Sequence, residues 1–273
     1  MNNFISSLKK SIFFVSLLFL FFFSCEKKET MSCTLDESAT IEKTIILDDF
    51  NEIELYFKGN VRIKQGEKST ITFIGYSLLL DNIKRPVINN KLIINLNNPF
   101  CKPSITQEII ITTPNLQKLI LREKSQTVIS DFENQKNLNL QILSNSSVEL
   151  NDFIGLEYLG IELKEGSSFT SKKQIKNVSL MKIHILGNGH VNSYSIRAQK
   201  VEVEIHGKGY CEVTALKRLD VNVVGNGNVY YMGMQKIHKR IDGKGDVYCS
   251  NKFLIELPQN NITSITESLN NSN

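Results

Sequence analysis

The feature that most constrains the fold of this chain is a repeat of about 20 residues across its C-terminal half. In each unit one apolar residue, called the anchor below, follows a turn-forming stretch. The anchors are Val148, Phe169, Val191, Cys211, Val229 and Val247, which are 21, 22, 20, 18 and 18 residues apart. In every unit but the last, apolar residues also stand ten, eight and six positions before the anchor. A fixed period of this length is typical of stacked repeats, in which each unit buries its apolar face only against its neighbours.

The apolar residues within each unit alternate with other residues, as in Leu138, Leu140 and Ile142. Period two with β-branched residues is typical of strands that have one buried and one solvated face. Antiparallel hairpins alternate too, but they do not require the same apolar offset in every unit. The sequence therefore predicts an all-β fold, a single-stranded parallel β-helix or solenoid with stacked coils of about 18–22 residues.

A short glycine-containing stretch precedes the anchor in four units, which read GNGHV from 187, GKGYC from 207, GNGNV from 225 and GKGDV from 243. Because glycine adopts positive φ without a steric cost, we expect these stretches at the corners of the coils. Asn188 and Asn226 also tolerate the left-handed region. Ser144 and Glu165 stand at the equivalent place in two earlier units. A nucleotide-binding loop would need one glycine segment that leads into a helix, and four repeated copies do not fit that pattern.

Residues 1–24 are typical of a bacterial lipoprotein signal peptide. Two lysines precede an apolar run at 12–23, which is too short to span a membrane comfortably. Ser24 followed by Cys25 resembles a site at which the cysteine is acylated and becomes the new N-terminus, so we predict lipidation at Cys25. An N-terminal signal-anchor is the alternative interpretation. Both interpretations predict an exported protein that is held at a membrane by its N-terminus.

The rest of the chain divides by composition into three parts. Residues 25–43 are polar and without an apolar period, which predicts an acylated cysteine and a flexible tether. Residues 44–252 carry the β-helix domain. Residues 253–273 are rich in Asn and Ser and predict a polar tail.

The charges of the chain exclude one class of partner. The 32 basic and 28 acidic residues are scattered and give a net charge of +4, so there is no basic run long enough for a nucleic-acid arm. We therefore expect no nucleic-acid partner, and no motif in the chain predicts a cofactor.

Two further segments carry a resemblance to a known family. They are FNEIELYFKGNVRIKQGEKSTITFIGYSLLLDNIKRPVINNKLIINL at 50–96 and IIITTPNLQKLIL at 109–121. Together with the repeated Gly-x-Gly-x-Val, they make the chain resemble, over about residues 45–250, the family called putative auto-transporter adhesin, head GIN domain. The resemblance implies a right-handed β-helix without a known reaction, and a cell-envelope protein, in particular an outer-membrane lipoprotein. Ser144 and Glu165 replace the usual first glycine, which puts the corner geometry of their units in question.

The residues that flank the anchors are expected to point outward in two columns, with about 4.8 Å between coils. We call these eight residues the outer ladder: His190, Tyr210, Asn228 and Asp246 in one column, and Asn192, Glu212, Tyr230 and Tyr248 in the other. Sugar rings stack on aromatic rings while amides and carboxylates meet their hydroxyls, so the ladder predicts a binding surface for an envelope glycan or a partner protein. The alternative is that tyrosine simply favours half-exposed strand positions.

A carbohydrate-active enzyme is the alternative function, because polysaccharide lyases and hydrolases also use parallel β-helices. Its nearest candidate residues are Asp220, Asp242 and Asp246 with Lys208, Arg240 and Lys244, which we expect in different columns. His184 and His206 occupy outward positions without a nucleophile or clustered acids, so the sequence predicts neither a triad nor a metal site. We therefore expect a binding or structural module with no catalytic residue.

The last predictions concern the cysteines and the C-terminal end of the stack. Cys211 and Cys249 are both expected to face inward, in coils too far apart for a disulfide. Cys33 and Cys101 are a candidate disulfide of an exported protein. Lys239 interrupts the apolar triplet of the last unit, and we expect Lys239 and Arg240 to protect the open end of the stack.

Overall fold

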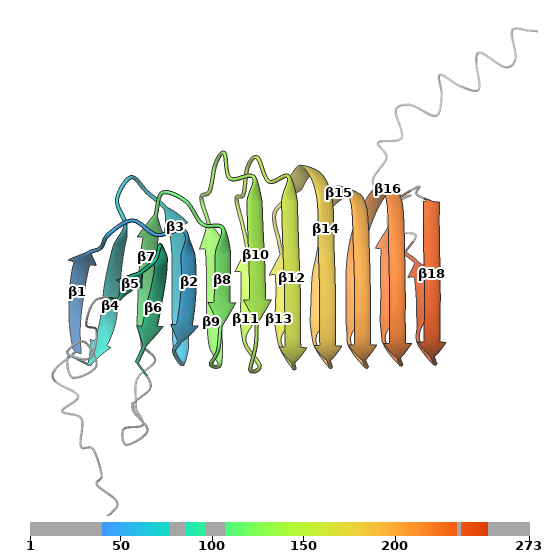
Figure 1. The fold of residues 1–273 in the computed structure, drawn as a ribbon, viewed down its shortest axis with the longest axis horizontal. Coiled ribbons are helices and arrows are strands. Elements are labelled where there is room, and N and C mark those ends of the chain that lie inside the picture. Colours follow the sequence, from blue (N-terminus) through green and yellow to red (C-terminus); the bar gives the residue numbers. More distant parts are fainter. Residues whose placement is uncertain (1–39, 77–85, 97–106, 234–235, 251–273) are drawn as a thin grey trace, which may run out of the picture. The chain divides into compact units, whose positions relative to one another are not determined.

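The computed structural model describes residues 40–76, 86–96, 107–233 and 236–250, and within these ranges the chain forms strands and no helix (Figure 1). In these ranges we find no helix with the length and apolar character needed to cross a membrane. The strands before the repeats are β1 (Thr40–Ile46), β2 (Glu52–Tyr56), β3 (Gly59–Gln65), β4 (Thr70–Tyr76), β5 (Val87–Ile88), β6 (Lys91–Asn95) and β7 (Glu108–Thr113). The strands of the repeat region are β8 (Lys118–Leu121), β9 (Ser125–Ser130), β10 (Asn137–Ile142), β11 (Ser147–Leu150), β12 (Tyr158–Glu165), β13 (Ser168–Ser171), β14 (Ile175–Gly187), β15 (His190–Gly207), β16 (Tyr210–Gly225), β17 (Asn228–Met232), β18 (Lys236–Gly243) and β19 (Asp246–Cys249).

Parallel pairing stacks the repeat region into a β-solenoid with two main rows of strands (Figure 1). The first row consists of β8, β10, β12, β14, the second halves of β15 and β16, and β18. The second row consists of β9, β11, β13, the first halves of β15 and β16, β17 and β19. β15 and β16 continue from one row into the other, with register shifts between their two halves. The predicted fold class is thereby confirmed.

The strand register reproduces the inward columns that the repeat predicts. The anchors pair from coil to coil in the order Val148, Phe169, Val191, Cys211, Val229 and Val247. The last apolar position before each corner pairs in the same way and is buried in Ile142, Leu163, Ile185, Ile205 and Val223. Each fully buried side chain of this size contributes about 1.5–3 kcal/mol relative to an exposed one, so these columns are the main stabilising element of the stack.

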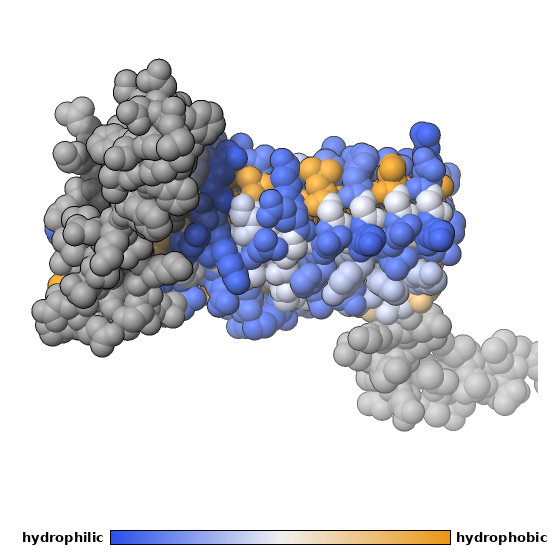
Figure 2. Space-filling model, turned by 90° about the horizontal axis from the view of Figure 1, so that it is seen from below, coloured by the Kyte–Doolittle hydropathy of each residue, from blue (hydrophilic) through white to orange (hydrophobic). Residues whose placement is uncertain are grey.

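The predicted corners have the backbone conformation that glycine favours. The first glycine of each stretch has positive φ, at 99° in Gly187 and 131° in Gly207. Glu165, which pairs with Gly187, has a φ of 57°, so the corner keeps its left-handed residue without glycine. Asn188 and Asn226 do not have positive φ, and the expectation that they share this role was wrong. Figure 2 views the molecule from the side on which β8, β10, β12, β14 and β18 end, and there residues of similar hydropathy form rows along the stack.

In the N-terminal part the coils do not stack in the order of the sequence, as the repeat would predict. β2 pairs in parallel with both β6 and β8, and β3 with both β7 and β9. The coil made of β2 and β3 therefore lies between two coils that follow it in the sequence. β4 pairs antiparallel with β7, and β1 pairs antiparallel with β4. Hairpin-type pairing thus occurs at this end, where β1 and β4 cover the edge of the parallel stack. β1 begins at Thr40, inside the range predicted as a tether.

The last coil is less buried than the others. Lys239 pairs with Val221 and so occupies the column that is apolar in the preceding coils, and its Nζ lies 2.9 Å from Asp246 Oδ1. Cys211 is buried as predicted, and burial raises the pKa of its thiol. Cys249 pairs with Tyr231 and so continues the inward column of the buried Val213, as predicted, but its side chain is exposed. It belongs to β19, and no described coil packs beyond that strand to cover it.

Several predictions concern residues outside the described ranges. They are the signal peptide at 1–24, lipidation at Cys25, the pairing of Cys33 with Cys101, and the tail at 253–273. These stay predictions.

Candidate functional site

The outer ladder lies on the second row of strands. In its first column His190 pairs with Tyr210, and the column continues through Asn228 to Asp246. The second column is formed in the same way by Asn192, Glu212, Tyr230 and Tyr248. The structure therefore brings all eight residues together in two columns that are two positions apart on each strand, as the sequence predicts. Ligand binding by the ladder stays a prediction.

Aromatic rings stack within both columns. The ring centroids of His190 and Tyr210 are 5.4 Å apart with an interplanar angle of 10°. Those of Tyr230 and Tyr248 are also 5.4 Å apart, with an angle of 22°. Tyr210 is 41% exposed and Tyr248 is 45% exposed, so each column presents an aromatic ring to solvent. These separations lie within the 4.5–7 Å that favourable aromatic pairs adopt.

Polar contacts hold the C-terminal end of the first column, at Asn228 and Asp246, in place. The backbone N–H of Asp246 donates to Asn228 Oδ1 at 3.1 Å. Lys239 Nζ donates to Asp246 Oδ1 at 2.9 Å, and this bond holds the pKa of the carboxyl below its ordinary value. Asp246 is therefore an anionic hydrogen-bond acceptor at neutral pH, next to the exposed ring of Tyr248 on the same strand.

An open groove of about 820 Å³ lies over the first row of strands. Most of the residues that line it are polar, among them Asn139, Gln141, Glu162, Lys182, Glu202 and Asp220. Asp220 forms ion pairs with Arg218 at 2.8 Å and Lys200 at 3.3 Å, and a hydrogen bond joins it to His238 Nδ1 at 3.0 Å. Burial raises the pKa of Asp220, but hydrogen bonds from these three partners outweigh it and hold the pKa below its ordinary value.

Glu202 extends this network toward the N-terminal coils. It pairs with Lys200 at 2.5 Å and with Lys182 at 3.0 Å, and the hydrogen bond from Lys200 is the main reason that its pKa is lowered. The floor of the groove is therefore a network of ion pairs, in which the carboxylates of Glu202 and Asp220 are charged at neutral pH.

The candidate residues of the enzyme alternative do not converge in the structure. Asp220 on β16 pairs in register with His238 on β18. Asp242 stands four residues after His238 on β18, which is about 13 Å along the strand at 3.3 Å per residue. Asp246 lies on β19, in the other row. Among the described carboxylates with a shifted pKa, every shift is downward, which suits ion pairs and not a general acid.

The corner lysines and the arginine of that alternative are separated as well. Lys208 and Lys244 belong to the corners that follow β15 and β18 and are exposed. Arg240 pairs in register with Asn222 on the first row. The geometry gives the enzyme alternative no support.

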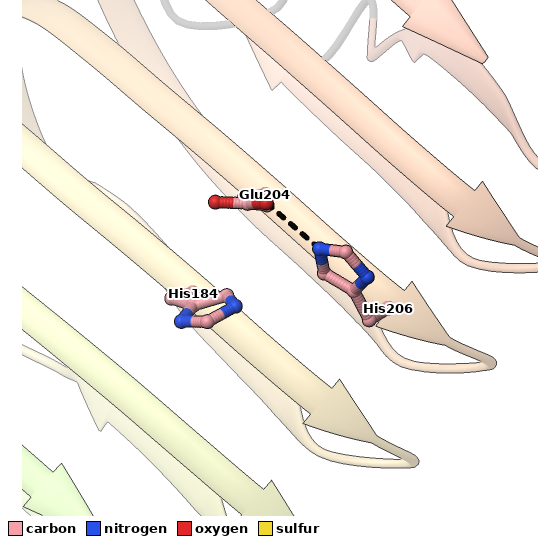
Figure 3. Close-up of side chains that lie close together, drawn as sticks. All are labelled: His184, Glu204 and His206. Atoms are coloured by element: carbon pink, nitrogen blue, oxygen red, sulfur yellow. Dashed lines mark hydrogen bonds and ion pairs between the residues drawn. The ribbon is translucent and has the colours of Figure 1, made fainter. Parts of the chain in front are cut away.

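One cluster was missed by sequence reasoning. His184 on β14 pairs in register with Glu204 on β15, and His206 stands two residues after Glu204 on the same face (Figure 3). Glu204 Oε1 lies 2.7 Å from His206 Nε2, and the two imidazole rings have centroids 5.7 Å apart. The signal was present in the sequence, because Glu204 stands one 20-residue coil after His184.

Comparisons with known proteins agree with the fold. A family model described as "Putative auto-transporter adhesin, head GIN domain" matches residues 49–234. A search of the curated proteins gave no match. The solved structure of a "putative adhesin" from Bacteroides fragilis has a TM-score of 0.70 and 19% identity, covering 77% of this chain and 97% of its own.

Two structures from other bacteria are similar in the same way. A "putative lipid binding protein" from Parabacteroides distasonis has a TM-score of 0.63 and 18% identity, covering 79% of this chain and 98% of its own. A "putative adhesin" from Parabacteroides merdae has a TM-score of 0.63 and 17% identity, with the same coverage. At these identities the likeness concerns the fold.

Proposed function

The chain belongs to the family described as putative auto-transporter adhesin, head GIN domain, and on this premise we propose that it is an exported binding module of the cell envelope. Its ligand is a glycan that lies along the outer ladder. The observation that carries the proposal is the pair of in-register aromatic stacks, each with one ring more than 40% exposed.

The ladder suits a sugar chain because its contacts repeat along one line. Apolar faces of sugar rings stack on tyrosine, while hydroxyls are satisfied by the carboxylate of Asp246 and by amide side chains such as Asn192. Strand spacing in the stack is about 4.8 Å, so a glycan that lies along the axis contacts a new coil every 4.8 Å or so. Binding to such an open surface needs no enclosed pocket.

The N-terminus supplies the attachment in this proposal. Acylation of Cys25 holds the module at the membrane, since each buried methylene contributes about 0.8 kcal/mol and two or more chains give lasting attachment. Mass spectrometry of the mature N-terminus tests this step: the Cys25→Ala variant loses the lipid and the cleavage before residue 25. An unmodified N-terminus in the wild-type protein contradicts it.

Glycan binding is tested by screening the full chain, in detergent, on an array of bacterial envelope polysaccharides. Changing Tyr210 and Tyr248 together to Ala is expected to weaken binding about tenfold, because each stacking contact is worth about 0.5–1.5 kcal/mol. Tyr158→Ala is the matched control, since Tyr158 lines the groove on the first row and is not part of the outer ladder. Circular dichroism verifies that all variants keep their β structure.

Three outcomes contradict the proposal. Equal binding by the double tyrosine variant places the ligand elsewhere. Cleaved glycan in the same incubation favours the enzyme alternative. Binding to lipid vesicles in place of glycans, with no effect of the tyrosines, assigns the module a lipid ligand, as the name of the Parabacteroides distasonis structure states for that protein.

A further inference from the structure

The register of two neighbouring coils brings two imidazoles and a carboxylate to one spot on the outer surface of the first row. His184 and Glu204 are direct partners on the parallel strands β14 and β15. His206 projects from the same face of β15, since residues two apart in a strand share a face. One ligand atom from each of the three side chains lies within 4.8 Å of the other two (Figure 3).

We propose that His184, Glu204 and His206 bind a divalent late first-row transition-metal ion, such as Zn²⁺ or Cu²⁺. Imidazole nitrogen and carboxylate oxygen are the ligands that these ions prefer when no thiolate is present. Three protein ligands leave at least one position open for water or for a group of a bound ligand. This site is separate from the outer ladder, which lies on the second row of strands.

Coordination requires only a small movement of side chains. In a tetrahedral site with bonds of about 2.0–2.1 Å, ligand atoms are about 3.3 Å from one another. Glu204 and His206 already have atoms 2.7 Å apart, and their side chains are 47% and 42% exposed. Half-exposed side chains rotate freely enough to close the remaining gap to His184, whereas the strands that carry them stay in register.

The charge of the cluster also suits a cation. Glu204 places a carboxylate oxygen 2.7 Å from His206 Nε2, so an acidic ligand stands beside an imidazole nitrogen. Its neighbours Glu162 and Glu202 are engaged by lysines, at 3.4 Å from Lys164 and 3.0 Å from Lys182. Glu204 is instead hydrogen-bonded to an imidazole, a group whose nitrogen is itself a metal ligand.

The four histidines of the chain provide matched controls, because two belong to the cluster and two, His190 and His238, do not. The full chain in detergent is stripped with a chelator and titrated with ZnCl₂ by calorimetry. We expect one ion per chain, and at least about tenfold weaker binding in His184→Gln and in His206→Gln. His190→Gln and His238→Gln are expected to bind as the wild type does.

A second readout identifies the ligands directly. In the Cu²⁺-loaded protein, electron paramagnetic resonance is expected to show hyperfine coupling from two imidazole nitrogens, and from one in His184→Gln and in His206→Gln. Zn²⁺ is also expected to raise the melting temperature of the wild type and not that of Glu204→Gln, because a ligand that binds only the folded state stabilises it.

Two results overturn the proposal. Undiminished binding in the double variant His184→Gln with His206→Gln assigns the ion to other groups of the chain. Binding that is lost equally in His238→Gln shows that a general loss of imidazole, and not this cluster, is responsible. Circular dichroism of each histidine variant shows whether it is folded, which separates either result from misfolding.

Discussion

At the scale of single residues, the corner of each coil is decided by one backbone conformation. Gly187 and Glu165 are partners in register and both have positive φ, yet only one of them is glycine. An L-residue in the left-handed region costs roughly 1–2 kcal/mol, so Glu165 is a strained solution to the problem that Gly187 solves without strain.

We expect Glu165→Gly to stabilise the protein by up to about 1 kcal/mol, because relief of strain exceeds the added flexibility of the unfolded chain. Gly187→Ala is the reciprocal control. Its added Cβ meets only ordinary contacts, the nearest at 3.5 Å, so its φ of 99° alone is expected to cost about 1–2 kcal/mol. Urea denaturation of both variants measures the two changes, and a destabilised Glu165→Gly contradicts this account.

The second glycine of a corner acts differently. At Gly227 a Cβ would lie 2.6 Å from the carbonyl oxygen of Gly209 in the preceding coil. Close approach of the preceding backbone and of the Ile205 side chain, whose Cγ2 would lie 2.5 Å away, and not positive φ, excludes a side chain there. Gly227→Ala is therefore expected to lower the midpoint of the same urea transition, while an unchanged midpoint would show that the corner has room to shift.

At the scale of elements, parallel register places equivalent positions of successive strands side by side, so charges outside form columns as apolar residues do inside. Asp220 on β16 is in register with His238 on β18, and it contacts Lys200 on β15 diagonally, since the direct partner of Lys200 is Arg218. These polar contacts tie three successive coils of the first row together. Because they lie at the surface, each contributes little alone and the network is screened by salt.

Asp220 gives this network a defined pH dependence. Its folded pKa is lower than the ordinary 3.8, so its stabilising effect is present above that value and is lost as the pH falls through the folded pKa. We expect Asp220→Asn to be less stable than the wild type at pH 7 and to lose less stability between pH 5 and pH 2. Thermal melts across this range measure the difference, and parallel curves for the two proteins contradict the assignment.

At the scale of the whole described unit, the two ends of the stack are closed by different means. Antiparallel β1 and β4 cover the N-terminal end. At the other end, Lys239 occupies an inward column that holds Val221 one coil earlier, and it pairs with Asp246. A charge at an inward position of an edge coil opposes further pairing with another chain.

Replacing Lys239 with Val is expected to complete the apolar triplet of the last coil and to promote self-association through that end. Sedimentation velocity measures the change, with Lys244→Val as a control at an exposed corner position. A Lys239→Val protein that sediments as the wild type does would show that the end is protected by other means.

The sequence by itself determined the repeating part of this protein. The period and the constant apolar offset predicted the solenoid, the anchor columns, the corners and the two columns of the outer ladder. They could do so because a parallel stack in constant register converts spacing along the chain directly into neighbourhood in space. Where the period applies, as for His190 and Tyr210, sequence and structure agree.

Only the tertiary structure decided what the period does not encode. The position of the β2–β3 coil between two later coils, the antiparallel strands at the N-terminal end and the exposure of Cys249 depend on which elements meet at an edge. The cluster of His184, Glu204 and His206 depends on side-chain directions in adjacent coils, which spacing alone leaves open. Backbone register follows from a repeated local pattern. The closure of the ends follows from contacts between parts of the chain that share no pattern, and the geometry of a side-chain cluster follows from the directions that its side chains take.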